Sequence, residues 1–214
     1  MHRRRGIHSD YRQDDLRNLL SVIFVKIIYE NLIFILWLIW IIYWRLAGRN
    51  VKAAARRESM LSRAGHIVPL IIAALLLALP TLPGGFLCGR VFPGTEFTYW
   101  IGVVVILAGL AFSVWARIHL GRNWSGIVTL KQEHELIRSG PYRLVRNPIY
   151  TGLLLGFIGT AIARDEWRGW LAVLIVFAAL WRKLRLEERW LTEQFGETYI
   201  QYRGKVASLI PFLL

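Results

Sequence analysis

The chain has 214 residues, of which 55% are hydrophobic, and a formal net charge of +13. Ordinary soluble domains are only about 45–50% apolar, and the basic residues here stand between long apolar stretches. We therefore expect a membrane protein and no nucleic-acid partner. The single cysteine, Cys88, excludes an intrachain disulfide and a cysteine-cluster metal site, so no metal is predicted. The sequence predicts one integral membrane domain over residues 1–214.

Five apolar segments predict an all-α fold, a polytopic helical bundle with about five transmembrane helices. In chain order, the segments are 19–44, 67–89, 97–116, 147–163 and 169–181. The first contains Lys26 and Glu30, which lie one helical turn apart and can pair; its alternative is an interfacial helix joined to a shorter span. Only residues 164–168 separate the last two segments, which predicts a tight C-terminal helical hairpin.

The basic residues predict an orientation. Loops 45–66 and 117–146 and the tail after Trp181 are rich in lysine and arginine, whereas loop 90–96 and the 164–168 turn are not. Basic loops stay on the cytoplasmic side and attract anionic lipid head groups. The three basic regions should therefore lie together and face the cytoplasm. With five spans, the same distribution of basic residues places the N-terminus outside. The N-terminal segment is itself basic, however, so the side on which it lies is left open.

A polar run over residues 134–152 precedes the fourth apolar segment. Gly140-Pro141 within it indicates a turn, and Asn147-Pro148 indicates a helix start with Asn147 as the cap and Pro148 at the first helical position. The free amides of such a helix start favour an anionic group such as a carboxylate. The alternative is a capped membrane helix without further function.

A second polar element follows the fifth segment. Residues 184–191 are expected to continue that helix into the cytoplasm, and Lys183 and Glu187 lie one turn apart on one face. The alternative is a solvated helix face with ion pairs. Because the predicted hairpin brings this helix close to the loop before Pro148, the two polar elements should form a site at the membrane surface.

The second half of the chain resembles the isoprenylcysteine carboxyl methyltransferase and phospholipid methyltransferase family of integral membrane enzymes. The matching pieces, in the order of the family, are residues 120–125, 134–137, 140–142, 146–152, 187–188 and 195–199 with Tyr202 and Val206. Residues 1–100 resemble the family only as membrane spans. The resemblance divides the chain into N-terminal spans, 1–116, and a methyltransferase-like core, 117–214, with a cytoplasmic cofactor pocket.

The resemblance implies a methyltransferase that depends on S-adenosyl-L-methionine. The family's cofactor contacts carry over to His134, Glu135, Leu136, Ile137, Tyr142, Asn147, Pro148, Ile149, Tyr150 and Glu187, with Glu188 beside them. Catalytic positioning of the acceptor would fall to Lys183, where the prenylcysteine enzymes carry arginine, and to Arg185. The family usually has histidine where this chain has Asn147. Asparagine does not titrate near neutral pH, which favours a binding role there.

The acceptor is expected to be a membrane lipid or another lipophilic or small molecule, and no protein partner is predicted. A carboxylate, as in isoprenylcysteine, suits a cation such as Lys183 because it is already a nucleophile. The alternatives are N-methylation of phosphatidylethanolamine and S-methylation of a thiol. Two further alternatives are a structural membrane module without catalysis and a reductase, for which no Gly-x-Gly-x-x-Gly fingerprint is found.

Overall fold

The computed structural model describes residues 31–49, 54–79, 85–92, 94–121, 124, 129–131 and 136–211. The predicted pair of Lys26 and Glu30, and the candidate residues His134 and Glu135, lie outside these ranges. The chain divides into two compact units, residues 1–41 and 42–214. A helix over Asn31–Ala47 opens the described part, and every element below belongs to the second unit.

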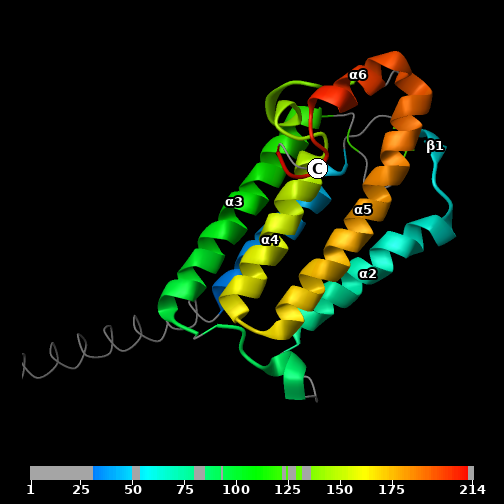
Figure 1. The fold of residues 1–214 in the computed structure, drawn as a ribbon. Coiled ribbons are helices and arrows are strands. Elements are labelled where there is room, and N and C mark those ends of the chain that lie inside the picture. The colour runs from blue at the N-terminus through cyan, green and yellow to red at the C-terminus, as the bar shows by residue number, and fades with distance from the viewer. Residues whose placement is uncertain are drawn as a thin grey trace, which may run out of the picture. The chain divides into compact units, whose positions relative to one another are not determined.

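The second unit is built mainly from helices (Figure 1). Its α-helices are α2 (Met60–Ala78), α3 (Glu96–Leu120), α4 (Pro148–Arg164), α5 (Trp167–Phe195) and α6 (Glu197–Lys205), and its 3₁₀ turns are η1 (Gly85–Cys88) and η3 (Gly140–Arg143). Strands β1 (Ala54–Arg57) and β2 (Thr129–Lys131) pair antiparallel. The predicted helical bundle is confirmed, and the small sheet departs from the all-α prediction.

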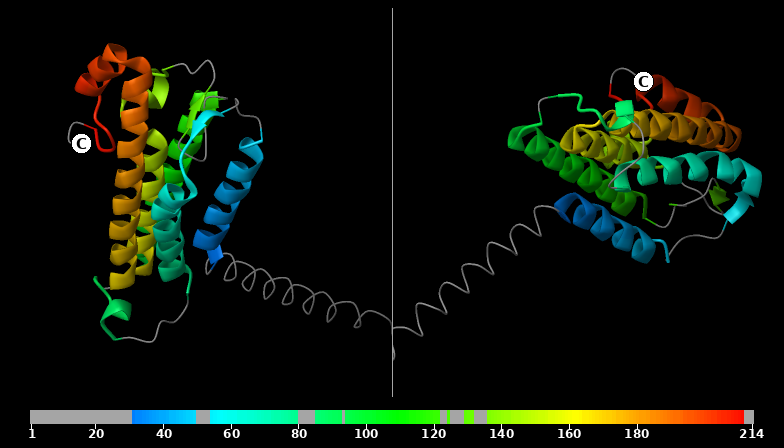
Figure 2. Two further views of the ribbon diagram at one scale, coloured as in Figure 1. Left: turned by 90° about the vertical axis from the view of Figure 1, so that its right-hand side faces the viewer. Right: turned by 90° about the horizontal axis from the view of Figure 1, so that it is seen from below.

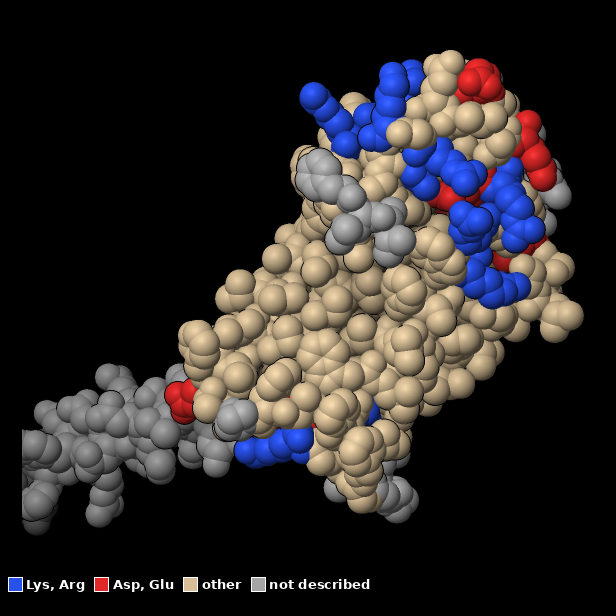
Figure 3. Space-filling view, viewed as in Figure 1, with Lys and Arg blue, Asp and Glu red and all other residues tan. Residues whose placement is uncertain are grey.

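Two of the described helices, α2 and α3, are long and apolar enough to cross a membrane, and Asn31–Ala47 and α4 are shorter apolar helices. Figure 3 shows an almost uncharged belt between a charged end, at α6 and the end of α5, and a few charges at the opposite end. The predicted bounds of the second span, 67–89, are wrong. The helix begins earlier because Ser59 caps it, its hydroxyl accepting from the Ser62 amide at 3.2 Å, and it ends before Pro80, which disfavours helical geometry in Leu79.

The α3–α4 seam is the closest helix contact in the unit, and glycines make it possible. The two helices run side by side (Figure 2). A Cβ added to Gly102 would lie 2.5 Å from the Gly159 carbonyl oxygen, and one added to Gly109 would lie 2.6 Å from that of Gly152. The glycines of the fourth segment therefore serve packing within the bundle.

Replacing Gly152 with alanine should destabilise the bundle. The new methyl group would lie within 2.4 Å of the Gly109 carbonyl oxygen, a backbone atom that cannot rotate away. Overpacking of this kind costs about 1–3 kcal/mol, which thermal unfolding in detergent would reveal as a lower melting temperature. Gly204→Ala is the matched control, because an added Cβ there meets nothing within 4 Å. Equal melting temperatures for the two variants would contradict the close seam.

The predicted helical hairpin is confirmed at the turn between α4 and α5. Asp165 adopts a left-handed conformation with φ of 54° and ends α4. Its carboxylate accepts from the Phe92 amide at 2.7 Å, and an isolated bridge joins Arg90 to Glu166. Loop 90–92 and the 164–168 turn therefore lie at the same end of the bundle.

The three basic regions meet at the opposite end, as predicted. Strand β1 brings loop 45–66 to strand β2 of loop 117–146. Arg182, at the start of the tail, donates to the Ser62 carbonyl oxygen at 2.9 Å. Helix α5 runs without a break from the apolar belt into this end (Figure 1), which confirms that the fifth segment continues as a polar helix.

Candidate functional site

Three side chains from α4 and α5 meet where the hairpin reaches the basic end. The Tyr150 hydroxyl donates to the Glu187 carboxylate, with 2.8 Å to each oxygen. The ammonium of Lys183 lies 4.0 Å from Glu187 Oε1 and 5.3 Å from the centre of the Tyr150 ring. The predicted approach of the loop before α4 to the helix after Trp181 is confirmed. We call Tyr150, Lys183 and Glu187 the hairpin cluster.

The hairpin cluster is shielded from water but not closed. The side chains of Lys183 and Glu187 are 10% and 23% exposed. Burial raises the pKa of Glu187 above the ordinary carboxyl value, and the nearby charge of Lys183 and the Tyr150 hydrogen bond offset part of that rise. Glu187 is therefore costly to ionise without a cation beside it, and a second cation would further stabilise its charged form.

Glu188 lies next to Glu187 in sequence but has other partners. It is 3% exposed, and its Oε1 accepts from Arg146 Nη2 at 2.6 Å and Nε at 3.0 Å. The Ser208 hydroxyl donates to the same oxygen at 3.2 Å. Glu188 thus joins α5 to the loop before α4 and to the C-terminal segment, apart from the hairpin cluster.

The C-terminal segment, residues 206–209, lies against the start of α4. The amides of Arg146 and Asn147 donate to the carbonyl oxygens of Ala207 at 2.8 Å and Ser208 at 3.0 Å. At the end of the segment, the Leu209 carbonyl oxygen accepts from the Thr151 hydroxyl of α4 at 2.7 Å. The segment thereby fixes the position of the loop that leads into α4.

Asn147 occupies the cap position of α4 and Pro148 opens the helix, as predicted. The Asn147 side chain makes no cap hydrogen bond, because its amide donates instead to the backbone and hydroxyl oxygens of Ser208, both at 3.3 Å. The amides of Tyr150 and Thr151 bind the backbone oxygen of Asn147, each at 3.0 Å. The Thr151 bond is the first regular bond of the helix, and the Tyr150 amide, one of those expected to receive an anion, is already paired.

Tyr142 is buried in η3 beside two further rings. Its carbonyl oxygen accepts from the Tyr202 hydroxyl at 2.5 Å, and its ring stacks with that of His119, with 6.5 Å between centroids. Burial raises the pKa of Tyr142 and raises that of Tyr202 to about 12, so both stay neutral at physiological pH. Tyr142 is placed to supply an apolar, uncharged wall.

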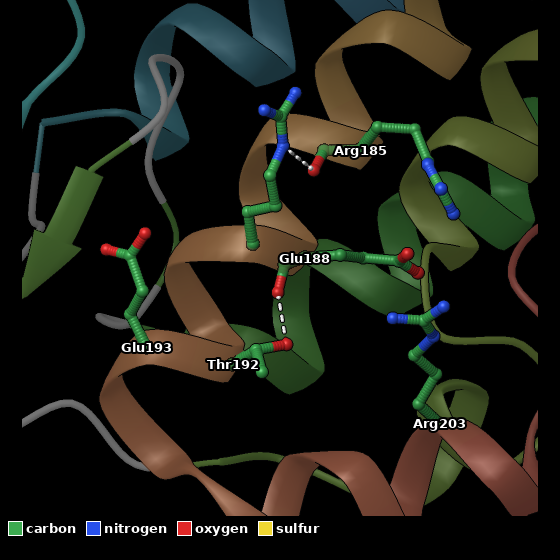
Figure 4. A pocket seen from close by; sticks show the side chains of 6 residues that line it. Arg185, Glu188, Thr192, Glu193 and Arg203 are labelled. Carbon is green, nitrogen blue, oxygen red and sulfur yellow. Dashed lines mark hydrogen bonds between the residues drawn. The ribbon is translucent and has the colours of Figure 1, made fainter.

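Arg185 lies away from the hairpin cluster, because residues two apart on a helix face different directions. Its guanidinium lies 5.9 Å from the Trp181 ring. In Figure 4, Arg185 and Arg203 point towards the Glu188 carboxylate between them, at an open pocket of 570 Å³. Among the other candidates, Pro148 is buried, while Leu136, Ile137 and Ile149 are partly buried.

The residues that the sequence did not single out for the site are Arg146, Ser208, and the pair Glu58 and His66 near the start of α2. Arg146 and Ser208 stand on elements that the resemblance covers or borders, so a search for partners of Glu188 could have proposed them. Nothing in the sequence places α2 beside Lys183, because that contact depends on how the helices pack.

The hairpin cluster suits the chemistry of S-adenosyl-L-methionine. That cofactor carries an ammonium group and a cationic sulfonium, for which the Glu187 carboxylate and the Tyr150 ring are matching partners. Its uncharged adenosine suits the neutral wall at Tyr142. In the described part of the chain, no group of three or more His, Cys, Asp or Glu side chains is placed to hold a metal ion.

Comparison with known proteins finds relatives of the part of the chain that contains the hairpin cluster. The family model of phospholipid methyltransferases matches residues 97–198, which include α3, η3, α4 and the hairpin cluster. Protein-S-isoprenylcysteine O-methyltransferase B of Arabidopsis thaliana is 30% identical over 131 residues, 57% of this chain and 65% of that protein. These matches support the resemblance to the isoprenylcysteine carboxyl methyltransferase and phospholipid methyltransferase family.

Other members of this family show the same extent of likeness. Protein-S-isoprenylcysteine O-methyltransferase of Saccharomyces cerevisiae is 32% identical over 125 residues, 56% of this chain and 51% of that protein. The solved structure of the eukaryotic intramembrane Ras methyltransferase, isoprenylcysteine carboxyl methyltransferase, has a TM-score of 0.51 at 23% identity. It covers 72% of this chain and 52% of its own, so it supports the fold. The chain spans between about half and two thirds of the lengths of these relatives.

Proposed function

We propose that this chain is a multi-pass integral membrane methyltransferase that uses S-adenosyl-L-methionine and methylates a lipophilic or small acceptor. The observation that carries the proposal is the hairpin cluster, where Tyr150, Lys183 and Glu187 meet within the residues that the family model matches. Residues 117–214 form the methyltransferase core, and residues 1–116 supply spans. The basic end, with the cofactor pocket, faces the cytoplasm.

Each member of the hairpin cluster has a separate task. Glu187 holds the ammonium end of the cofactor, and the Tyr150 hydroxyl keeps the carboxylate oxygens in place. The sulfonium supplies an activated methyl group, so the protein's work is alignment and the exclusion of water. Lys183, on the same face of α5 as Glu187, orients the acceptor. His134 to Ile137 and Tyr142 enclose the adenosine, with Asn147, Pro148 and Ile149 lining the start of α4.

A carboxylate is one acceptor that fits this arrangement, since the two relatives are named for O-methylation of isoprenylcysteine. Lys183 attracts an anion and would hold it beside the cofactor. Lysine is a compact point charge without the two-pronged geometry of arginine, so it selects less strictly for a carboxylate. An amine, as in phosphatidylethanolamine, or a thiol is the second candidate class.

The test is to incubate the purified full chain with methyl-labelled S-adenosyl-L-methionine and a membrane lipid extract. We expect calorimetry to detect cofactor binding, and mass spectrometry to find the label in a lipid fraction. Protein heated above its melting temperature is the control for uncatalysed methylation. A folded chain that binds no cofactor would contradict the proposal and leave the alternative of a structural membrane module.

A further inference from the structure

A buried histidine on α2 lies beside the hairpin cluster and outside the residues that the family model matches. His66 is 1% exposed. Its Nε2 lies 3.4 Å from Glu58 Oε1, close enough for an ion pair, and neither ring nitrogen has a hydrogen-bond partner in the part of the chain that the structure describes. A buried polar atom is normally paired, so an unpaired one needs an explanation.

Contacts between α2 and α5 fix the position of this histidine. Arg182 on α5 donates to the Ser62 carbonyl oxygen at 2.9 Å, and the Ser62 hydroxyl donates to Glu58 Oε2 at 3.1 Å. Gly65 allows the close approach, because a Cβ there would lie 2.8 Å from Cζ of Arg182. Glu58 is therefore held from two sides, by Ser62 and by His66.

The Glu58–His66 pair shares its electrostatic surroundings with the hairpin cluster. The charged groups that act on the imidazole are Glu58 before α2, Arg63 on α2, and Arg182 and Lys183 on α5. Glu58 in turn acts on Glu187. Lys183 lies 5.3 Å from the centre of the Tyr150 ring on α4. Its neighbour Arg182 packs against Gly65, the residue before His66, so the acceptor that Lys183 orients would be within reach of the imidazole.

We propose that His66, oriented by Glu58, is the general base that removes a proton from the methyl acceptor, and that the acceptor is a lipophilic thiol or amine. The Glu58 carboxylate, 3.4 Å from Nε2, attracts a proton on that nitrogen and so favours the tautomer with the proton on Nε2. That tautomer leaves Nδ1 with a free lone pair. This inference rests on the proposed methyl transfer and narrows the acceptor class.

The step balances without a further reactant. The acceptor's sulfur or nitrogen forms a bond to the methyl carbon as the bond from that carbon to the sulfonium breaks, and the sulfonium sulfur keeps the electron pair. The acceptor's proton passes to Nδ1 of His66 and later leaves to water. The products are the methylated acceptor and neutral S-adenosylhomocysteine. Glu58 balances the positive charge that forms on the imidazole.

The experiment measures labelled methyl transfer by the full chain in nanodiscs to three probes: a long-chain alkyl thiol, phosphatidylethanolamine and an S-farnesylated cysteine carboxylate. We expect wild type to methylate the thiol or the amine, and His66→Gln to lower kcat for that probe about 100-fold or more, as loss of a general base does. The wild-type rate should reach its plateau below the acceptor's own pKa. The rate of the variant should rise with pH until the acceptor itself ionises.

Two measurements separate loss of the base from loss of the fold. His66→Gln should bind S-adenosyl-L-methionine as wild type does, and imidazole added to His66→Ala should restore part of the rate. Glu58→Gln should lower the rate less than His66→Gln. Transfer to the carboxylate alone, or full activity of His66→Gln, would overturn the inference while leaving the methyltransferase intact. A wild-type chain that neither binds the cofactor nor methylates any probe would overturn the proposed function with it.

Discussion

Replacing Glu187 with glutamine is expected to weaken binding of S-adenosyl-L-methionine more than any other single change in the hairpin cluster. Glutamine keeps the shape of the side chain and can still accept from the Tyr150 hydroxyl, which lies 2.8 Å from the carboxylate, but it no longer pairs with the cofactor's ammonium group. Hydrogen bonds to charged groups contribute about 1.5–3 kcal/mol, so calorimetry should show a Kd raised roughly tenfold to 150-fold.

The same residue predicts how cofactor binding depends on pH. Burial raises the pKa of Glu187, and only the ionised carboxylate attracts a cation. Affinity should therefore fall as pH is lowered through a pKa that lies above the ordinary carboxyl value. Glu187→Gln should lose this dependence. A Kd that is equal for the two proteins at every pH would remove Glu187 from the binding site.

Stability should move in the opposite direction from binding in Glu187→Gln. Because the pKa is raised in the folded protein, ionised Glu187 destabilises the fold at any pH above that pKa. Glutamine carries no charge to bury. We expect its melting temperature at neutral pH to equal or exceed that of wild type, which would distinguish a lost contact with the cofactor from general unfolding.

Replacing the neighbouring Glu188 with alanine is expected to produce the largest loss of stability. Glu188 and Arg146 are 4% and 9% exposed at the side chain, and their closest atoms are 2.6 Å apart. Removing one member of a buried ion pair leaves the other charge uncompensated, which costs about 3–5 kcal/mol. The loss should appear as a lower midpoint in thermal or denaturant unfolding in detergent.

A double-mutant cycle gives this prediction its control. Arg146→Met with Glu188→Ala removes both charges together, so the double variant should lose less stability than the sum of the two single variants. Single variants whose effects simply add would show that the two side chains do not interact. Glu187→Gln, one position away on the same helix, is the control for substitution at this end of α5.

The hairpin and its polar extension could be predicted from the sequence because both depend on local patterns. A short connection between two apolar segments forces an antiparallel pair, and the one-turn spacing of Lys183 and Glu187 puts both on one face. The structure confirms the arrangement and adds Tyr150 as the group from α4 that meets them. The three basic regions were likewise predicted to meet, since loops on one side of a membrane share a charge bias.

The other features of the site depend on contacts between residues that are distant in the sequence. Asn147 followed by proline predicts a side-chain helix cap. The Asn147 side chain instead donates a hydrogen bond to Ser208, 61 positions later. Glu188 was grouped with Glu187 because they are adjacent, yet adjacent helical residues face about 100° apart, and Glu188 lies with Arg146 and Ser208. The position of His66 beside Lys183 follows only from the packing of α2 on α5.

The glycine seam between α3 and α4 has a consequence for how a lipid-like acceptor could reach the site. At Gly109 and Gly152 an added carbon atom would already collide with the backbone of the opposite helix. An acyl or prenyl chain is wider than that atom, so it has no passage between α3 and α4 from the bilayer. Lateral entry must therefore use another face of the bundle.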